Sequence, residues 1–293
     1  MNSKETNRRF VILAALASVL ILFGAKPAAA QDWFKTGTGL GVSKVRVAAP
    51  DFAIRGATSP ALEKTFHDVL WNDLEYSGIL ELVSASFYPS KIPSQQSELN
   101  APDWANAPAN TNMLAYGNLS SEGSNLLAAG FLSDVHNPTA PIALQKIYRG
   151  ASSDADARRL AHQFADDIIG RLSGGLAGIA QTQIAYVSNK SGTKEVWAMD
   201  YDGGNQHQLT HLKSIALTPR WSPDATRIAF TCFVPYRGIT SPQICLFSTA
   251  SDRMISFPRF RGTNSSPAWS PDGAQLAFMS SQNGDPEIGR AHV

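Results

Sequence analysis

Two histidines four residues apart, His207 and His211, are the first residues whose types suggest chemistry, because paired imidazoles bind zinc. Residues 206–211 are predicted to form a strand and a turn, where this spacing does not bring two side chains together as it would on a helix. We therefore expect no zinc site here. Residues 200–205 resemble half of a calcium-binding loop, but the later bidentate glutamate is missing and the position favours a β-hairpin turn.

Ser222 and Ser270 are the serines that a search for a nucleophile would select. Neither lies in the Gly-x-Ser-x-Gly motif of serine hydrolases, and each belongs to a Ser-Pro-Asp turn that explains its presence. The chain also lacks a phosphate-binding glycine loop and a Cys-x-x-Cys pair. The sequence thus predicts no catalytic residue, no cofactor and no metal ligand, and it favours a protein that is not an enzyme.

Acidic residues gather in a predicted helix that starts near Ser153 and ends at residues 174–175. Its apolar positions have the spacing of an amphipathic helix that packs on a core, and they are Leu160, Phe164, Ile168 and Leu172. We expect the polar face to be solvated, and its acidic residues are Asp154, Asp156, Asp166 and Asp167. His162 is predicted to be a surface or packing residue rather than a ligand.

The serine turns belong to a motif that occurs twice, 48 residues apart, at residues 221–225 and 269–273. Each copy is followed by an apolar strand-like run, and a repeat of roughly 40 to 50 residues with one such turn is typical of a β-propeller blade. The proline presets the backbone for a type I turn, which the serine and aspartate side chains can close. The residues that we assign to these turns are Trp221, Pro223, Asp224, Trp269, Pro271, Asp272 and Gly273.

Cys232 and Cys245 are the two cysteines of the chain, and they fall on two apolar runs that flank residues 234–242. These runs could be paired strands of one blade, so the cysteines could form a disulfide in an oxidising compartment. Two small buried thiols are the alternative, because a bridge depends on Cβ geometry that the sequence does not fix. Both interpretations stay open.

Residues 1–30 have the three parts of a secretory signal: a basic start, an apolar run over residues 10–23, and a small-residue cleavage site that ends at Ala30. The apolar run is shorter than the ~20 residues that a membrane-spanning helix needs, so we expect cleavage and not an anchor. The whole chain has a formal net charge of +1 and no run of basic residues. This charge pattern argues against a nucleic-acid partner.

Residues 31–178 are predicted to form a separate α+β domain with a helix on each flank. The first helix starts at Ser59-Pro60 and stops at Gly78, and residues 85–112 lack periodicity and suggest a long surface connection. The predicted strands of this domain are residues 45–49, 79–83, 113–117, 126–132 and 142–148.

The order of these parts resembles the TolB family of the Tol-Pal envelope system. Residues 47–52, 73–78, 159–166 and 182–188 resemble segments of that family in the same order. The resemblance implies a periplasmic protein, peripheral to the envelope, with a small α/β domain before a six-bladed propeller. It also implies binding of the lipoprotein Pal by the propeller and of TolA by the mature amino terminus, with roles in outer-membrane integrity and in constriction at division. Residues 31–41 depart from the TolA-contacting segment of the family.

The predicted fold class is therefore an α+β domain followed by an incomplete β-propeller, residues 179–293, of about two and a half blades with WSPDG-type turns. Because the resemblance implies six blades, we expect a truncated or frame-shifted sequence or a fragment. One alternative function is a propeller that gates a secreted serine hydrolase whose catalytic domain is missing. Another is a propeller that binds a small ligand or sugar polymer in its channel.

Overall fold

The computed structural model describes residues 44–293. The predicted signal segment, its cleavage site at Ala30 and residues 31–41 lie outside the described residues, so these expectations stay predictions. None of the described helices has the length and apolar character that crossing a lipid bilayer requires.

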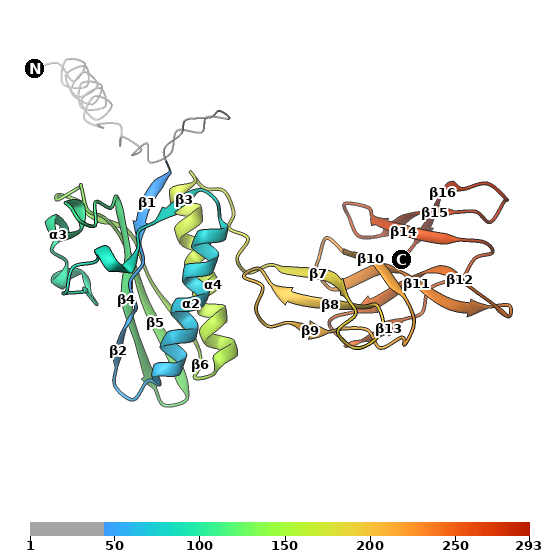
Figure 1. Cartoon of the computed structure of the whole chain (residues 1–293), viewed down its shortest axis with the longest axis horizontal. Coiled ribbons are helices and arrows are strands. Elements are labelled where there is room, and N and C mark those ends of the chain that lie inside the picture. Colours follow the sequence, from blue (N-terminus) through green and yellow to red (C-terminus); the bar gives the residue numbers. More distant parts are fainter. Residues whose placement is uncertain (1–43) are drawn as a thin grey trace, which may run out of the picture. The chain divides into compact units, whose positions relative to one another are not determined.

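A mixed β-sheet organises the first part of the described chain (Figure 1). Its strands lie in the order β3-β1-β4-β5-β6, and β2 also pairs with β4. Strand β1 is parallel to β3 and β4, whereas the neighbours β4, β5 and β6 are antiparallel. The strands are β1 Val45–Ala48, β2 Ala53–Arg55, β3 Leu80–Leu82, β4 Met113–Glu122, β5 Asn125–Asp134 and β6 Ile142–Ala151.

The helices α2 (Pro60–Tyr76) and α4 (Asp154–Leu172) pack against each other on one face of this sheet (Figure 1). The expectation of a helix on each flank is therefore wrong. Phe52, just before β2, contacts Phe66 of α2 and Phe164 of α4, with ring centroids 4.8 and 5.8 Å apart. Both apolar stripes converge on this one aromatic cluster, which is why both helices cover the same face.

Both helices begin where the sequence predicts, and the cap geometry explains why. The Ser59 hydroxyl accepts a hydrogen bond from the backbone N–H of Ala61, and Pro60 occupies the first helical turn, where its missing N–H costs nothing. In α4 the Ser153 hydroxyl accepts from the N–H of Asp156. Each helix is thus fixed in register by a local cap before tertiary packing acts on it.

The opposite face of the sheet is covered by residues 85–112, which the sequence predicts to be a surface connection. The segment instead forms two short 3₁₀ helices, η1 and η2, and the helix α3, and its Trp104 is 1% exposed. Trp104 packs in a cluster with Leu114, Tyr116 and Phe131 of the sheet. The prediction failed because a short helix with one large anchor has no periodicity to detect. The bounds are η1 Ala85–Phe87, η2 Gln96–Glu98 and α3 Ala101–Ala105.

The second part of the chain forms three antiparallel sheets, one of four strands and two of three strands (Figure 1). This is the incomplete β-propeller that the repeat predicts. The first sheet contains β7 Gln183–Ser188, β8 Glu195–Asp200 and β9 His207–Gln208. The second contains β10 Ala216–Trp221, β11 Arg227–Tyr236, β12 Ile239–Ser248 and β13 Arg253–Ile255, and the third contains β14 Asn264–Trp269, β15 Gln275–Ser280 and β16 Glu287–His292.

The sheets pack face to face through alternating residues of the central strand β11. Ile228 and Phe230 point into a cluster with Val196 of the first sheet. Ala229, between them, belongs to a second cluster that includes Phe278 of the third sheet. Because side chains alternate across a strand with a period of two, one apolar run supplies both interfaces. This explains why the run after each turn is continuously apolar.

Candidate binding sites

The turn at Ser222 uses its polar side chains to hold its own backbone. The Ser222 hydroxyl accepts from the N–H of Arg227 (2.9 Å) and donates to the carboxylate of Asp224 (2.5 Å). The same carboxylate accepts from the N–H and the hydroxyl of Thr226. The hydrogen bond from the Ser222 hydroxyl, followed by those from Thr226, lowers the pKa of Asp224 to about 2. Ser222 is therefore engaged as a structural group that holds the turn.

The second turn repeats this geometry. The Ser270 hydroxyl accepts from the N–H of Gln275 (2.9 Å) and donates to Asp272 (2.5 Å), which also accepts from the N–H of Ala274. Gly273 occupies the left-handed backbone region with φ of 68°. The two copies are therefore equivalent in structure as well as in sequence.

The tryptophans of the motif lie where neighbouring sheets meet. Trp269 donates its indole N–H to the backbone oxygen of Arg220 (3.0 Å), and the guanidinium of Arg227 lies 4.8 Å from the Trp269 ring. Arg227 also donates to the backbone oxygen of Gly273 (2.9 Å). Trp221 packs against the cluster between the first two sheets. These contacts tie one repeat to the next, so the motif is a structural element.

The structure joins Cys232 and Cys245 by a disulfide between β11 and β12. The strand register pairs Cys232 with Gln243 and Cys245 with Phe230, so the cysteines are diagonal neighbours. Their Cα atoms are 5.8 Å apart, a separation that suits a disulfide. The bond closes the long hairpin of the second sheet.

His207 and His211 do not form a site. The ring Nδ1 of His207 lies 2.9 Å from the backbone oxygen of Asn205, and both histidines are exposed. Neither belongs to any group of potential metal ligands among residues 44–293. Asp200 ends β8, and β9 pairs antiparallel with that strand, so residues 200–205 contain the predicted hairpin turn.

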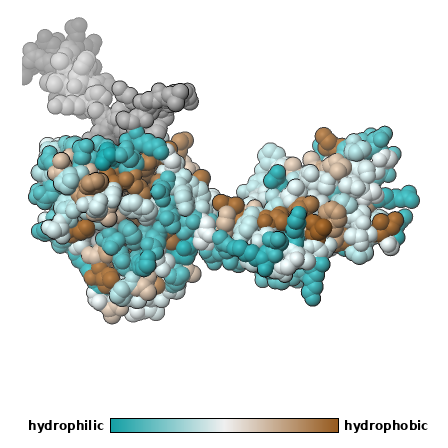
Figure 2. Space-filling model, in the orientation of Figure 1, coloured by the Kyte–Doolittle hydropathy of each residue, from teal (hydrophilic) through white to brown (hydrophobic). Residues whose placement is uncertain are grey.

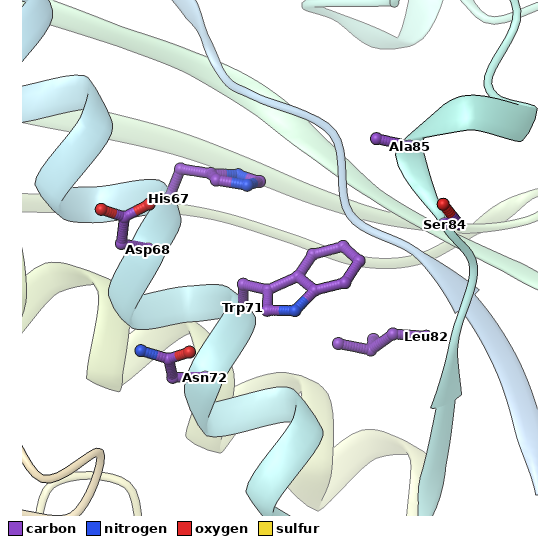
Figure 3. A pocket seen from close by; sticks show the side chains of 7 residues that line it. All are labelled: His67, Asp68, Trp71, Asn72, Leu82, Ser84 and Ala85. Carbon is purple, nitrogen blue, oxygen red and sulfur yellow. The ribbon is translucent and has the colours of Figure 1, made fainter.

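A groove in the amino-terminal domain is the first candidate for binding a partner (Figure 3). It encloses about 570 Å³ beside α2, and Figure 3 shows the Trp71 ring projecting from that helix toward Leu82. A neighbouring hollow of about 360 Å³ shares His67 and Trp71 and extends to Asp51 and Tyr88. The lining residues of the larger hollow are His67, Asp68, Trp71, Asn72, Leu82, Ser84 and Ala85.

The groove combines an aromatic ring with acidic side chains. His67 Nδ1 lies 3.2 Å from the carboxylate of Asp51, while Asp68 pairs with Lys64 on the solvent side. Burial lowers the pKa of His67, and the nearby Asp51 charge only partly opposes this effect. His67 is therefore a largely neutral wall of the groove near pH 7.

Exposed apolar side chains mark a second candidate surface, on the propeller sheets. Figure 2 shows hydrophobic residues gathered over this part of the visible face as well as over the amino-terminal domain. Apolar patches on a protein surface commonly serve protein contacts. The large exposed apolar residues in or beside the three sheets are Ile184, Ile215, Ile239, Met254, Ile288 and Val293.

A buried polar cluster lies where α4 meets the hairpin between β8 and β9. His162 Nδ1 is hydrogen-bonded to the carboxylate of Asp73 on α2 (2.6 Å). Arg158 donates to Asp200 (3.1 Å) and to Asp202 (2.6 Å). The sequence predicts His162 to be a surface or packing residue, and the structure buries it in an ion-pair network.

Burial controls the charge state of this cluster. It raises the pKa of Asp73 to about 6, and the hydrogen bond and charge of His162 oppose this effect only in part. Burial acts to lower the pKa of His162, but the hydrogen bond and charge of Asp73 raise it overall. The pair therefore holds a shared proton more tightly than either side chain would in water.

The polar face of α4 is not simply solvated, contrary to the sequence-based expectation. Asp166 accepts hydrogen bonds from the backbone N–H groups of Ala180 and Gln181, which lie between α4 and β7. Asp167 accepts from the hydroxyl of Tyr148 (2.6 Å). The charges of this face therefore attach neighbouring segments to the helix. No sequence signal reveals these partners, because most lie far away in the chain.

Two family models match the chain. The one described as the TolB amino-terminal domain matches residues 38–140, and the one described as the TolB beta propeller domain matches residues 171–289. The first match includes the mixed sheet up to β5 with helix α2, and the second includes the three antiparallel sheets, while β6 and most of α4 lie between the two matches.

Curated relatives match most of the chain. A "Protein TolB homolog" from Chlorobium chlorochromatii is 31% identical over 252 residues, which cover 85% of this chain and 54% of that protein. A "Tol-Pal system protein TolB" from Cereibacter sphaeroides is 32% identical over 226 residues, which cover 74% and 49%. The chain thus spans about half the length of these relatives.

A solved structure shows the same fold. The crystal structure of TolB from Acinetobacter baumannii aligns with a TM-score of 0.70 at 23% identity, covering 86% of this chain and 58% of that one. The mixed sheet, the propeller sheets, both family models and the curated relatives agree, and the chain belongs to the TolB family.

Proposed function

We propose that this protein is a periplasmic protein-binding scaffold of the Tol-Pal envelope system, with a role in outer-membrane integrity and in constriction during division. The observation that carries the proposal is the succession, in one chain, of a TolB amino-terminal domain and TolB propeller repeats. Relatives that match most of this chain are named Tol-Pal system proteins. A secretory signal cleaved after Ala30 would deliver the protein to that compartment.

The surfaces of the described residues suit protein binding. The three propeller sheets expose single large apolar side chains, and the groove beside α2 presents the Trp71 ring between acidic and apolar walls. Aromatic and apolar groups on a rigid sheet or helix are common anchors of protein interfaces. The turn serines, in contrast, are held in hydrogen bonds that keep the backbone folded.

Two partners follow from the family: the lipoprotein Pal, bound by the propeller, and TolA, bound by the mature amino terminus. The test uses the exported chain and a variant that lacks residues 31–43, each titrated with the soluble domains of Pal and TolA. We expect the intact chain to bind both partners at micromolar concentration. The shortened variant should keep Pal binding and lose TolA binding, because the deleted segment lies outside the propeller.

The outcomes separate the two assignments. Pal binding that disappears with residues 31–43 would contradict the propeller as the Pal surface. Absence of binding to both partners by a folded chain would overturn the proposed function. Circular dichroism on both proteins establishes that each is folded, so that a negative result can be interpreted.

A further inference from the structure

The imidazole of His162 presents one nitrogen that has no partner. The side chain is only 7% exposed, and its Nδ1 is occupied by Asp73. Its Nε2 is buried and makes no hydrogen bond in the described structure. This atom lies 3.8 Å from the carboxylate of Asp200, and donor atoms of His162, Asp200 and Asp202 all lie within 4.8 Å of one another. A buried imidazole nitrogen that faces two carboxylates can bind a cation together with them.

We propose that His162, Asp200 and Asp202 bind a divalent transition-metal ion of the zinc class. One imidazole nitrogen and two carboxylate oxygens, with water as a fourth ligand, form a donor set that Zn²⁺ accepts in tetrahedral geometry. The site lies where α4 meets the β8–β9 hairpin, so a bound ion would clamp these elements together. The sequence predicts no metal ligand in this chain, and the proposal is independent of the Tol-Pal partners.

The Asp73 carboxyl supplies the outer support that metal-bound histidines usually have. A histidine that ligates a metal through one nitrogen commonly donates the N–H of the other nitrogen to a carboxylate, which fixes the ring orientation and tautomer. His162 has this arrangement, with Asp73 at 2.6 Å from Nδ1 and Nε2 turned toward the carboxylates. The arrangement needs three elements that are distant in sequence: α2, α4 and the β8–β9 hairpin.

Formal charge also favours a divalent ion. The carboxylates of Asp200 and Asp202 contact the guanidinium of Arg158, and the carboxylate of Asp73 contacts His162. With a neutral His162 the cluster carries a net charge of about −2, which a divalent cation cancels. Protonation of His162 cancels only half of this negative charge. The metal replaces the proton on Nε2, so zinc affinity should increase as the pH rises.

Arg158 limits where the ion can lie. Its Nη2 is 2.6 Å from Asp202 and 3.1 Å from Asp200, and a guanidinium offers no lone pair to a metal. The ion therefore has to share Asp200 and Asp202 with Arg158 and approach from the His162 side. A hollow of about 390 Å³ lined by Arg158, His162 and Asp200 reaches this position and provides access.

A second group of potential ligands, Asp51, Glu63 and His67, also contains a buried imidazole nitrogen without a hydrogen-bond partner, but its side chains are more exposed. The Asp51 side chain is 76% exposed, and His67 is less buried than His162. Glu63 already accepts a hydrogen bond from the backbone N–H of Phe52. This group serves as the matched comparison in the test.

The test is titration of the chelator-treated full chain with zinc chloride, followed by calorimetry, with cobalt(II) absorption as the probe of a tetrahedral site. We expect one zinc ion per chain and a rise in the unfolding temperature on zinc addition. His162→Asn keeps an amide donor for Asp73 but deletes the Nε2 ligand, so it should weaken zinc binding by at least about 100-fold. Asp73→Asn, which removes only the outer support, should weaken it by about 10- to 100-fold.

His67→Asn is the matched control and should leave zinc affinity unchanged. Three results would each overturn the proposal. They are unaltered zinc binding by His162→Asn, absence of stoichiometric zinc binding by the parent chain, and loss of zinc binding by His67→Asn. If His162→Asn does not fold, as judged by unfolding curves in metal-free buffer, His162→Gln replaces it. His162→Gln should show the same loss, and zinc binding retained by that variant counts against the site.

Discussion

The carboxyl of Asp73 is fully buried between α2 and α4, and within residues 44–293 its hydrogen-bond partner is the imidazole of His162. Because the folded state raises the pKa of both groups, it holds protons that the unfolded chain would release. A group whose pKa is raised by folding contributes stability at low pH that is lost as pH rises through the folded value. The other charged groups that act on this pair are Asp166, Asp200 and Asp202, while Tyr201 feels the Asp73 charge and Arg158 pairs with Asp200 and Asp202.

The Asp73 carboxyl should make the stability of the protein depend on pH. Between the usual pKa of Asp73 and its folded value of about 6, the parent chain should lose stability relative to Asp73→Asn as the pH increases. Over this pH range, the free energy of unfolding of the parent chain should fall by on the order of 2–3 kcal/mol relative to that of Asp73→Asn. Urea unfolding of both proteins across this pH range, in the presence of chelator, measures it.

Asp68→Asn is the control for this pH experiment, because Asp68 lies on the same helix but is half exposed. The difference between the free energies of unfolding of Asp68→Asn and the parent chain should vary little over the same pH range. A difference between the parent and Asp73→Asn that is constant, or that grows with pH, would show that Asp73 titrates normally in the folded protein.

At the scale of the element, the two Ser-Pro-Asp turns differ at one informative position. Ala225 has φ of 55° and Gly273, its counterpart, has φ of 68°. The left-handed region costs a residue with a Cβ roughly 1–2 kcal/mol, whereas glycine occupies it freely. A Cβ on Gly273 would meet its nearest atoms at 3.5 Å, an ordinary contact. The backbone angle, and not the space, therefore distinguishes alanine from glycine here.

Reciprocal substitutions test this explanation. Gly273→Ala should destabilise the protein by about 1 kcal/mol, and Ala225→Gly should stabilise it by less than about 1 kcal/mol, because glycine also increases the entropy of the unfolded chain. Chemical unfolding curves measure both changes. Ala274→Gly, at a position with ordinary φ, should destabilise and so serves as the control. Equal stability of Gly273→Ala and the parent would refute the account.

At the scale of the molecule, the propeller sheets and the mixed sheet are joined by polar contacts as well as by the chain. Arg158 of α4 binds Asp200 and Asp202, and the Tyr201 hydroxyl donates to the backbone oxygen of Tyr76 (3.0 Å). Salt bridges that are mostly buried hold a geometry more specifically than apolar contact does, because a displaced partner leaves an uncompensated charge. The same cluster provides the proposed metal ligands.

Export should change the mass of the whole chain. Protein recovered from the periplasm should begin at Gln31 and should weigh two hydrogens less than the reduced chain, because cleavage follows Ala30 and the disulfide forms in an oxidising compartment. Intact mass measurement with and without a reductant tests both points. An Ala30→Arg variant should retain residues 1–30. A mature chain without the mass difference would show that Cys232 and Cys245 remain thiols.

The family and the incomplete propeller were predictable because their signals are local or periodic. A turn motif that recurs after 48 residues requires no knowledge of distant contacts, and the cap at Ser59-Pro60 determines where α2 begins. The continuous apolar run around Ala229 reflects a strand buried on both faces. These features depend on neighbours in the chain, so the sequence alone determined the two long helices, the propeller repeat and the order of these parts, but not the short helices of residues 85–112.

Tertiary structure alone decided how these elements meet. The shared face of α2 and α4, the burial of Trp104 and the pairing of Asp73 with His162 depend on contacts between segments far apart in the chain. Asp73 and His162 are 89 residues apart, and each is unremarkable in its own helix. Whether such polar residues lie in water or bind each other depends on which helix faces meet. That choice is made by packing of the whole core, and no local pattern records it.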